Sequence, residues 1–183
     1  MSKVYVFLAD GFEDIEGLTV VDLMRRTEIA VEMVSIKETK EVVTAHGIHI
    51  LADKVFTEVD FSDADMLVLP GGMPGTTNLG AYAPLTALLE DFYKKGGKIA
   101  AICAAPSVFA QLGFLKGRKA TAYPCFLSAL TGALTTEEKV VTDGNVTTSR
   151  GPGTAIDFAL SLIEQLIGRE KTQELADSIV YLQ

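Results

Sequence analysis

Residues 98–106 have the sequence KIAAICAAP, in which a short apolar run leads into a cysteine and then a proline. The first five residues predict a strand buried on both faces, and Pro106 suits the first turn of a following helix. Ala101 and Ala105 stand two residues before and two after Cys103, where a tight strand-to-helix turn needs small side chains. The stretch therefore predicts a nucleophile elbow, a strained turn with Cys103 at its apex.

Cys103 at such a turn has two interpretations. The dipole and free N–H groups of a helix N-terminus favour a thiolate, so we expect the pKa of Cys103 to lie well below the ~8.5 of a free thiol. The alternative is a small buried core residue, the commonest role of an unpaired cysteine. A strained backbone and a carboxyl within hydrogen-bonding reach of the sulfur would favour the first interpretation.

The rest of the chain alternates short apolar runs with amphipathic stretches, which predicts an α/β fold with a mostly parallel sheet and helices on both faces. The expected strands are 4–9, 30–36, 66–69, 98–102, 140–141 and 146–148, with short edge strands or a hairpin within 41–59. The expected helices are about 15–26, 84–95, 106–112, 152–167 and about 170–179. No linker or repeat interrupts residues 1–183, so we expect a single domain.

The composition limits the possible partners. Sixteen basic and twenty-four acidic residues give a formal net charge of −8, which argues against nucleic acid and against an anionic membrane surface. Two cysteines predict reduced thiols rather than a disulfide scaffold. The apolar run 4–9 is too short for a signal peptide or a membrane span. We therefore expect a cytoplasmic protein.

A glycine-rich segment, residues 70–75 (PGGMPG), follows the expected strand 66–69. The carboxyl ends of parallel strands meet at one edge of a sheet, so this segment should lie near Cys103. The backbone N–H groups of Gly72 and Ala104 are then candidates for an oxyanion hole. An ordinary turn would also explain the glycines, and the segment matches no nucleotide-binding motif, so we expect no cofactor.

Three acids, Glu13, Asp14 and Glu16, follow the first expected strand. Acids at the start of a helix usually interact only with its dipole. A carboxyl that faces a thiolate has its pKa raised by the like charge and can stay protonated. The pattern alone does not choose among the three residues for that role.

The histidines and three arginines give weaker signals. His46 and His49 are three residues apart on a weak strand and point to opposite faces, so together they form no metal site. A catalytic histidine would require the chain to fold back. Arg25, Arg26 and Arg150 are candidates for an anion-binding or interface cluster, with separate surface ion pairs as the alternative.

Four motifs together resemble the DJ-1/ThiJ/PfpI superfamily, and within it the small DJ-1 and YajL-like branch. They are residues 13–16 (EDIE), 69–72 (LPGG), 100–106 (AAICAAP) and 148–154 (TSRGPGT). The resemblance runs essentially from end to end. It implies a flavodoxin-like three-layer α/β sandwich that forms a homodimer and needs no cofactor.

The resemblance also implies the site residues. It places the reactive thiolate at Cys103 and the partner carboxylic acid at Glu16, with the amides of Gly72 and Ala104 stabilising an oxyanion. The supporting residues would be Gly71, Tyr123 and Arg150.

Two positions depart from relatives in the superfamily. The protease branches have histidine directly after the cysteine, where this chain has Ala104, and several DJ-1 proteins have histidine in place of Tyr123. A Cys-His protease is therefore a poor interpretation, because the base that would activate the thiol is missing. His46 falls where the DJ-1 pattern has an arginine near the dimer interface.

The resemblance leaves three functions open. The first is an enzyme for reactive dicarbonyls, either a glyoxalase that converts methylglyoxal into lactate or a deglycase that acts on glycated protein. The second is a non-enzymatic oxidative-stress sensor or chaperone that uses oxidation of Cys103, and the third is an inactive scaffold. The first two need the same Cys103 and Glu16, so the sequence does not separate them.

The expected homodimer has support from composition, since 48% of the residues are hydrophobic. The helix after the first strand carries an apolar face wide enough for both a core and a partner, formed by Leu18, Val20, Val21, Leu23 and Met24. We expect an interface of at least ~1,200–2,000 Å². Arg25, Arg26 and His46 should lie near it.

Overall fold

A seven-stranded sheet forms the centre of the computed structural model, which describes residues 1–181. The strand order is β10-β11-β7-β6-β1-β2-β5, and every pair is parallel except β10 with β11. The bounds are β1 Lys3–Leu8, β2 Ala30–Ser35, β5 Lys54–Val55, β6 Met66–Leu69, β7 Lys98–Ile102, β10 Val140–Asp143 and β11 Val146–Ser149. The expected mostly parallel sheet is confirmed.

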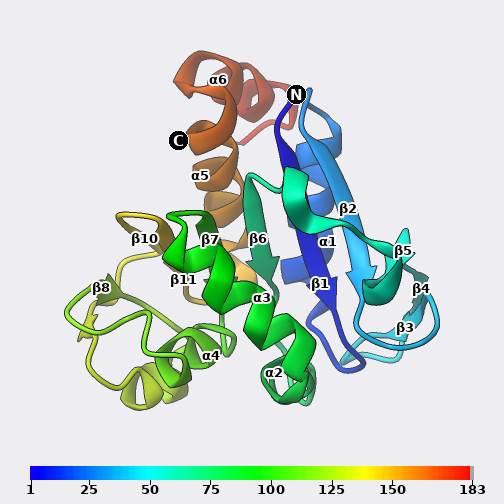
Figure 1. The fold of residues 1–183 in the computed structure, drawn as a ribbon. Coiled ribbons are helices and arrows are strands. Elements are labelled where there is room, and N and C mark those ends of the chain that lie inside the picture. The colour runs from blue at the N-terminus through cyan, green and yellow to red at the C-terminus, as the bar shows by residue number, and fades with distance from the viewer. Residues whose placement is uncertain (182–183) are drawn as a thin grey trace.

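Helices cover both faces of this sheet and complete the three-layer sandwich (Figure 1). One face carries α1 (Asp14–Arg25), α5 (Ala155–Ile167) and α6 (Arg169–Ser178), and the other carries α2 (Gly75–Ala81), α3 (Ala83–Lys94) and α4 (Pro106–Gln111). The sequence analysis did not predict α2. Its seven residues include two glycines and two threonines, which are poor helix formers, so its stability depends on packing.

Strand β1 lies inside the sheet and is apolar from Val4 to Leu8. Val4, Val6 and Leu8 belong to the core on the α1 and α5 side, whereas Tyr5 and Phe7 belong to the core on the α3 and α4 side. A strand that is covered on both faces needs apolar residues at every position rather than at alternate ones.

The apolar face of α1 is used mainly inside the protomer. Val20, Val21, Leu23 and Met24 are buried in the core that α1 shares with α5, and Leu18 packs partly against the same core. The protomer's own core already covers the four buried residues, so only the rest of the helix surface is available to the expected partner.

Short elements complete the fold. The hairpin expected within 41–59 is present as β3 (Glu41–Val43) and β4 (His49–Leu51), and a second small pair joins β8 (Lys119–Ala120) to β9 (Leu134–Thr135). The 3-10 segments are Phe56–Glu58, Phe61–Asp63, Pro124–Ala129 and Pro152–Thr154. Within residues 1–181, no helix has both the length and the apolar character that crossing a membrane requires.

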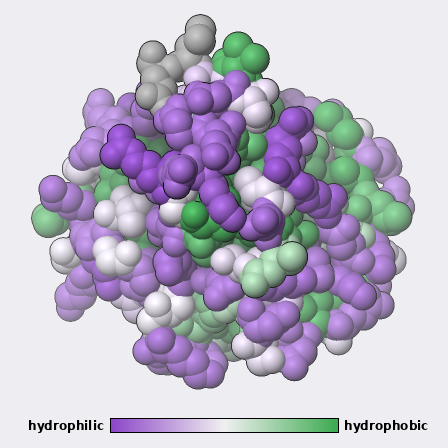
Figure 2. Space-filling view, turned by 90° about the horizontal axis from the view of Figure 1, so that it is seen from above, coloured by the Kyte–Doolittle hydropathy of each residue, from purple (hydrophilic) through white to green (hydrophobic). Residues whose placement is uncertain are grey.

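The two ends of the parallel sheet differ. The amino ends of the strands lie at the same end of the molecule as the N-terminus and α6, where hydrophilic side chains cover most of the surface (Figures 1 and 2). At the opposite end, the loops that follow β1, β6, β7 and β11 come together. Ligands of open α/β sheets bind at this carboxyl edge.

Candidate active site

Cys103 follows directly after β7 and has a backbone φ of 66°, in the left-handed region that side-chain-bearing residues seldom adopt. Such a conformation typically costs about 1–3 kcal/mol and persists where the surrounding fold enforces it. Here two hydrogen bonds hold it: the Cys103 N–H donates to the Ser149 carbonyl at 3.0 Å, and the Tyr123 N–H donates to the Cys103 carbonyl at 2.9 Å. The predicted strained elbow is confirmed.

Glu16 is the acid that meets this cysteine. It lies in the first turn of α1 and is fully buried, and its Oε2 accepts a hydrogen bond from the Gly71 N–H at 2.9 Å. Its Oε1 is also buried and has no hydrogen-bond partner of regular geometry within residues 1–181. A Cβ on Gly71 would lie 2.6 Å from both Oε2 of Glu16 and Cβ of Cys103, so only glycine fits between them.

The carboxyl and the thiol perturb each other. Burial raises the pKa of Glu16 to about 7, and Glu13 adds to the rise, whereas interactions with the Cys103 thiol and the Gly71 N–H oppose it. Burial also raises the pKa of Cys103 to about 12, together with repulsion by the Glu16 carboxylate and a hydrogen bond to it. The expectation of a thiol pKa well below that of free cysteine is therefore wrong.

The physical reason is that two buried acids share one site. Once one proton has left the pair, the remaining proton lies on either the sulfur or the carboxyl, and a second negative charge is strongly disfavoured. A Cys103 thiolate therefore forms when Glu16 takes the proton from the sulfur. The pair can add a thiolate to an electrophile and keep a carboxylic acid beside it.

Two backbone amides face the sulfur, those of Gly72 and Ala104, and both act to lower the pKa of Cys103. Gly72 has a φ of 87°, and a Cβ there would lie 2.3 Å from the Glu13 nitrogen. The glycine is therefore required for the close approach of the loop after β6 to the loop after β1. The geometry agrees with the expected pair of oxyanion donors.

Tyr123 and Gly151 border the same site. Tyr123 is 44% exposed, and a Cβ on Gly151 would lie 3.1 Å from its ring and 4.0 Å from Oε1 of Glu16. Arg150 precedes this glycine and donates from Nη1 to the carbonyl of Glu137 at 3.2 Å. In the described structure, Arg150 therefore ties the end of β11 to the preceding loop.

Comparison with known proteins identifies the family and the fold. The sequence model of the DJ-1/PfpI family matches residues 2–165. The chain belongs to the DJ-1/PfpI family. Protein dj-1beta of Drosophila melanogaster is 39% identical over 183 residues and covers 98% of both chains, which places the chain in the DJ-1 branch.

Other relatives in this family differ in length and in what their names state. Protein DJ-1 homolog B of Arabidopsis thaliana is 38% identical, and the present chain spans only 40% of its length. The Schizosaccharomyces pombe protein named glutathione-independent glyoxalase DJ-1 is 29% identical, with 98% of both chains covered. The solved structure of oxidised Toxoplasma gondii DJ-1 superimposes with a TM-score of 0.96 at 37% identity and covers both chains completely.

The arginine cluster expected from the sequence does not form. Arg25 pairs with Asp53 at 2.6 Å and Arg26 pairs with Asp22 at 2.8 Å. Both arginines lie at the C-terminal end of α1, far along the helix from the carboxyl edge of the sheet where Arg150 lies. The alternative of separate surface ion pairs is the correct one for Arg25 and Arg26.

His46 is brought back to this edge by the β3–β4 hairpin. Its Nδ1 lies 2.8 Å from Oδ1 of Asp14 and 3.7 Å from Oε1 of Glu13, and the hydrogen bond to Asp14 raises the pKa of His46. His49 instead pairs with Glu41 at 2.7 Å. Sequence reasoning missed the first grouping, because it depends on how the hairpin folds over the start of α1.

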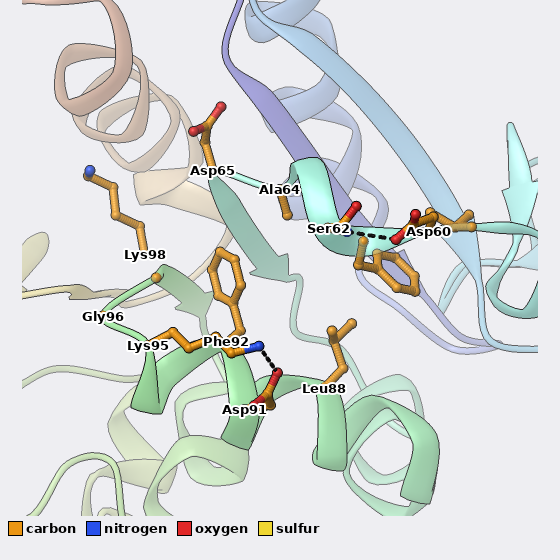
Figure 3. A pocket seen from close by; sticks show the side chains of 13 residues that line it. Asp60, Ser62, Ala64, Asp65, Leu88, Asp91, Phe92, Lys95, Gly96 and Lys98 are labelled. Atoms are coloured by element: carbon orange, nitrogen blue, oxygen red, sulfur yellow. Dashed lines mark hydrogen bonds and ion pairs between the residues drawn. The ribbon is translucent and has the colours of Figure 1, made fainter.

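A cavity of about 700 Å³ lies away from Cys103. It opens at the amino ends of β6 and β7, where Leu88 and Phe92 extend from α3 into it (Figure 3). Asp91 and Lys95 form an ion pair at its rim. Because the elbow lies at the other end of β7, this cavity takes no part in the site around Cys103.

Proposed function

We propose that this protein is a cofactor-independent protective enzyme that converts small α-oxo aldehydes, such as methylglyoxal, into 2-hydroxy acids. The observation that carries the proposal is the pairing of a strained Cys103 with a fully buried Glu16 whose pKa is close to neutral. A general base or acid works best when its pKa lies near the operating pH. The name of the S. pombe relative supports the same activity.

The reaction needs only these two side chains and water. Glu16 accepts the thiol proton, the Cys103 sulfur adds to the aldehyde carbon, and the resulting alkoxide takes up a proton to give a hemithioacetal. Glu16 then removes the hydrogen of that carbon as a proton, and a proton returns to the neighbouring carbon, which converts the adduct into a thioester. Hydrolysis by water releases the 2-hydroxy acid and restores the thiol, so methylglyoxal and water give lactate and one proton.

The amides of Gly72 and Ala104 would stabilise the oxyanions of these steps. Both face the Cys103 sulfur, where the aldehyde oxygen becomes negatively charged as the bond forms. If the dicarbonyl were already attached to a protein amine or thiol, the same addition would begin a deglycation. No histidine base is required, in agreement with Ala104 after the cysteine.

Steady-state measurement of lactate formation from methylglyoxal tests this function. We expect turnover by the wild-type protein and by Cys125→Ala, because Cys125 is exposed and lies outside the site. We expect none by Cys103→Ala. Absence of lactate from the wild-type protein, or equal turnover by Cys103→Ala, would refute the proposed activity.

A second candidate function is oxidative-stress sensing by Cys103. The two amides and the Glu16 carboxyl that surround the sulfur would also hold the oxygens of a sulfinate. The raised pKa of the thiol argues for slow oxidation, since peroxide attacks the thiolate. Mass spectrometry after graded peroxide treatment separates the candidates: a sensor would oxidise at Cys103 before Cys125.

We also propose that the chain forms a homodimer. Exposed apolar side chains lie on α1 and on the β3–β4 hairpin, namely Ile15 (51% exposed), Ile48 (49%) and Leu51 (69%). Sedimentation velocity should give twice the 19.6 kDa of one chain, and Leu51→Glu should shift the equilibrium toward monomer. A wild-type mass of one chain at micromolar concentration would contradict the dimer.

We also propose a cytoplasmic location. Both cysteines are free, which supports a reducing compartment.

A further inference from the structure

A second cavity of about 420 Å³ lies between α2, α4 and the 3-10 segment Pro124–Ala129. Apolar side chains make up much of its wall, and hydroxyl groups make up part of the rest. The residues that line it include Met73, Thr76, Ser107, Val108, Phe126 and Ala129. Its size lies in the range of pockets that bind small molecules.

Each wall of this cavity is connected by a backbone hydrogen bond to a residue that contacts Cys103. The bonds run from Thr76 N–H to the Gly72 carbonyl at 2.9 Å, from Ser107 N–H to the Ala104 carbonyl at 3.1 Å, and from Phe126 N–H to the Tyr123 carbonyl at 2.7 Å. The amides of Gly72 and Ala104 face the sulfur, and Tyr123 is bonded to the Cys103 carbonyl. The cavity is therefore built on the same loops as the reactive site.

One polar group in the cavity wall lacks a partner. Thr76 is 4% exposed, and its Oγ1 is buried with no hydrogen-bond partner within residues 1–181. A helical threonine hydroxyl often bonds to the carbonyl four residues back, but here it does not, although the Thr76 N–H bonds to that carbonyl of Gly72. By contrast, the Ser107 hydroxyl donates to the Ala104 carbonyl at 2.6 Å. An unpaired buried hydroxyl is costly and is satisfied when a ligand supplies a polar atom.

The apolar lining includes an exposed and a buried side chain. Met73 is 50% exposed just before α2, directly after Gly72, and Val108 is buried. The methyl group of methylglyoxal would fill only a small part of this space. The shape and chemistry suit a longer substituent that is itself apolar.

We propose that this cavity binds the substituent of the α-oxo aldehyde, and that the preferred substrates carry an aryl or branched alkyl group. The aldehyde carbon lies at the Cys103 sulfur, the substituent extends over Met73 toward Val108 and Phe126, and the ketone oxygen next to the substituent bonds to the Thr76 hydroxyl. This inference rests on the proposed function, because it assumes the same attack by Cys103. It assigns Thr76 as a positioning residue and not as a catalytic one.

The test compares two pairs of probes. Phenylglyoxal and methylglyoxal are the substrates, and mandelate and lactate, their 2-hydroxy acid products, are the ligands for binding measured by NMR without turnover. We expect the wild-type protein to bind mandelate at least ten times more tightly than lactate and to show a correspondingly lower KM for phenylglyoxal, since a single methylene in a fitted pocket is worth about tenfold or more.

Variants locate the effect. Ala129 is exposed and lines the cavity, so Ala129→Phe should block it without disturbing the core, weakening mandelate binding at least tenfold and lowering kcat/KM for phenylglyoxal by a larger factor than for methylglyoxal. Ala87→Phe, at an exposed position on α3 outside this cavity, is the matched control and should change neither. Thr76→Val should raise the KM for both aldehydes, which share the ketone oxygen, by a larger factor than it lowers kcat.

The outcomes are distinguishable. Equal binding of mandelate and lactate, or equal effects of Ala129→Phe on both substrates, would overturn the cavity assignment even if methylglyoxal is turned over. Mandelate binding that Ala129→Phe abolishes, with no turnover of either aldehyde, would support the cavity and refute the enzymatic function. A Thr76→Val protein with wild-type KM values would overturn the role of its hydroxyl.

Discussion

Replacement of Glu16 by glutamine should make the protein more stable, and the gain should depend on pH. The substitution keeps a carbonyl oxygen to accept the Gly71 N–H, which Oε2 of Glu16 accepts at 2.9 Å. It removes the charge from a side chain that is fully buried. Ionisation of this buried carboxyl lowers the free energy of unfolding of the wild-type protein, and the variant has no such charge.

The size of that cost follows from the pKa. A rise from the ordinary 4.5 to about 7 corresponds to about 3 kcal/mol of penalty for ionising Glu16 in the folded state. The unfolded chain loses this proton near its ordinary pKa, whereas the folded protein keeps it up to about pH 7. Because the folded state binds more protons in this window, wild-type stability falls as the pH rises through it and stays lower above it.

Denaturant unfolding of both proteins from about pH 4 to about pH 9 measures the difference. The free energy of unfolding of Glu16→Gln minus that of the wild type should be about 3 kcal/mol larger above pH 7 than below pH 4.5. For a chain of this size, that corresponds to roughly 6–12 °C in Tm. Glu90→Gln, which alters a surface carboxyl paired with Lys94, is the control and should show no such window. A pH-independent difference between wild type and Glu16→Gln, or one that grows on the acid side, would refute the reasoning.

Three further predictions concern neighbouring groups. The NMR titration of His46 should have its midpoint above that of an ordinary histidine because Asp14 hydrogen-bonds to it, and Asp14→Asn should lower the midpoint; an unchanged midpoint would contradict the pairing. Gly71→Ala should destabilise the protein by about 1–3 kcal/mol in thermal unfolding, because its Cβ would overlap the side chains of Cys103 and Glu16. In Glu16→Gln, the ultraviolet absorbance of the Cys103 thiolate should appear at lower pH than in the wild type, because repulsion by the carboxylate is gone. A titration at the same or higher pH would mean that the carboxylate does not raise the pKa of Cys103.

The elbow and the strands could be predicted from the sequence because their causes are local. The residues before Cys103 are apolar at every position, and alanines flank it where bulk would clash, so the strand and the turn follow from neighbours in the chain. From the sequence, Glu13, Asp14 and Glu16 were equally good candidates for the acid beside Cys103. Which of them meets the cysteine depends on where α1 begins and how it packs against the sheet.

Features that arise from tertiary contacts were not predicted from the sequence, or were predicted wrongly. The α2 helix has weak propensity and depends on its packing on the α3 and α4 side of the sheet. His46 reaches Asp14 only because a hairpin returns the chain. The thiol pKa was expected to fall from the helix dipole, but burial together with Glu16, a charge from another element, raises it.

The most direct test of the central claim, that Cys103 and Glu16 act as one catalytic unit, is a double-mutant cycle on kcat/KM for methylglyoxal. The proteins are wild type, Cys103→Ala, Glu16→Gln and the variant that carries both changes. We predict that each single substitution lowers kcat/KM by roughly 10²–10⁴-fold or more, to the same background as the double variant, because neither group works without the other. A Glu16→Gln protein with wild-type kcat/KM, or losses that multiply independently in the double variant, would contradict the account.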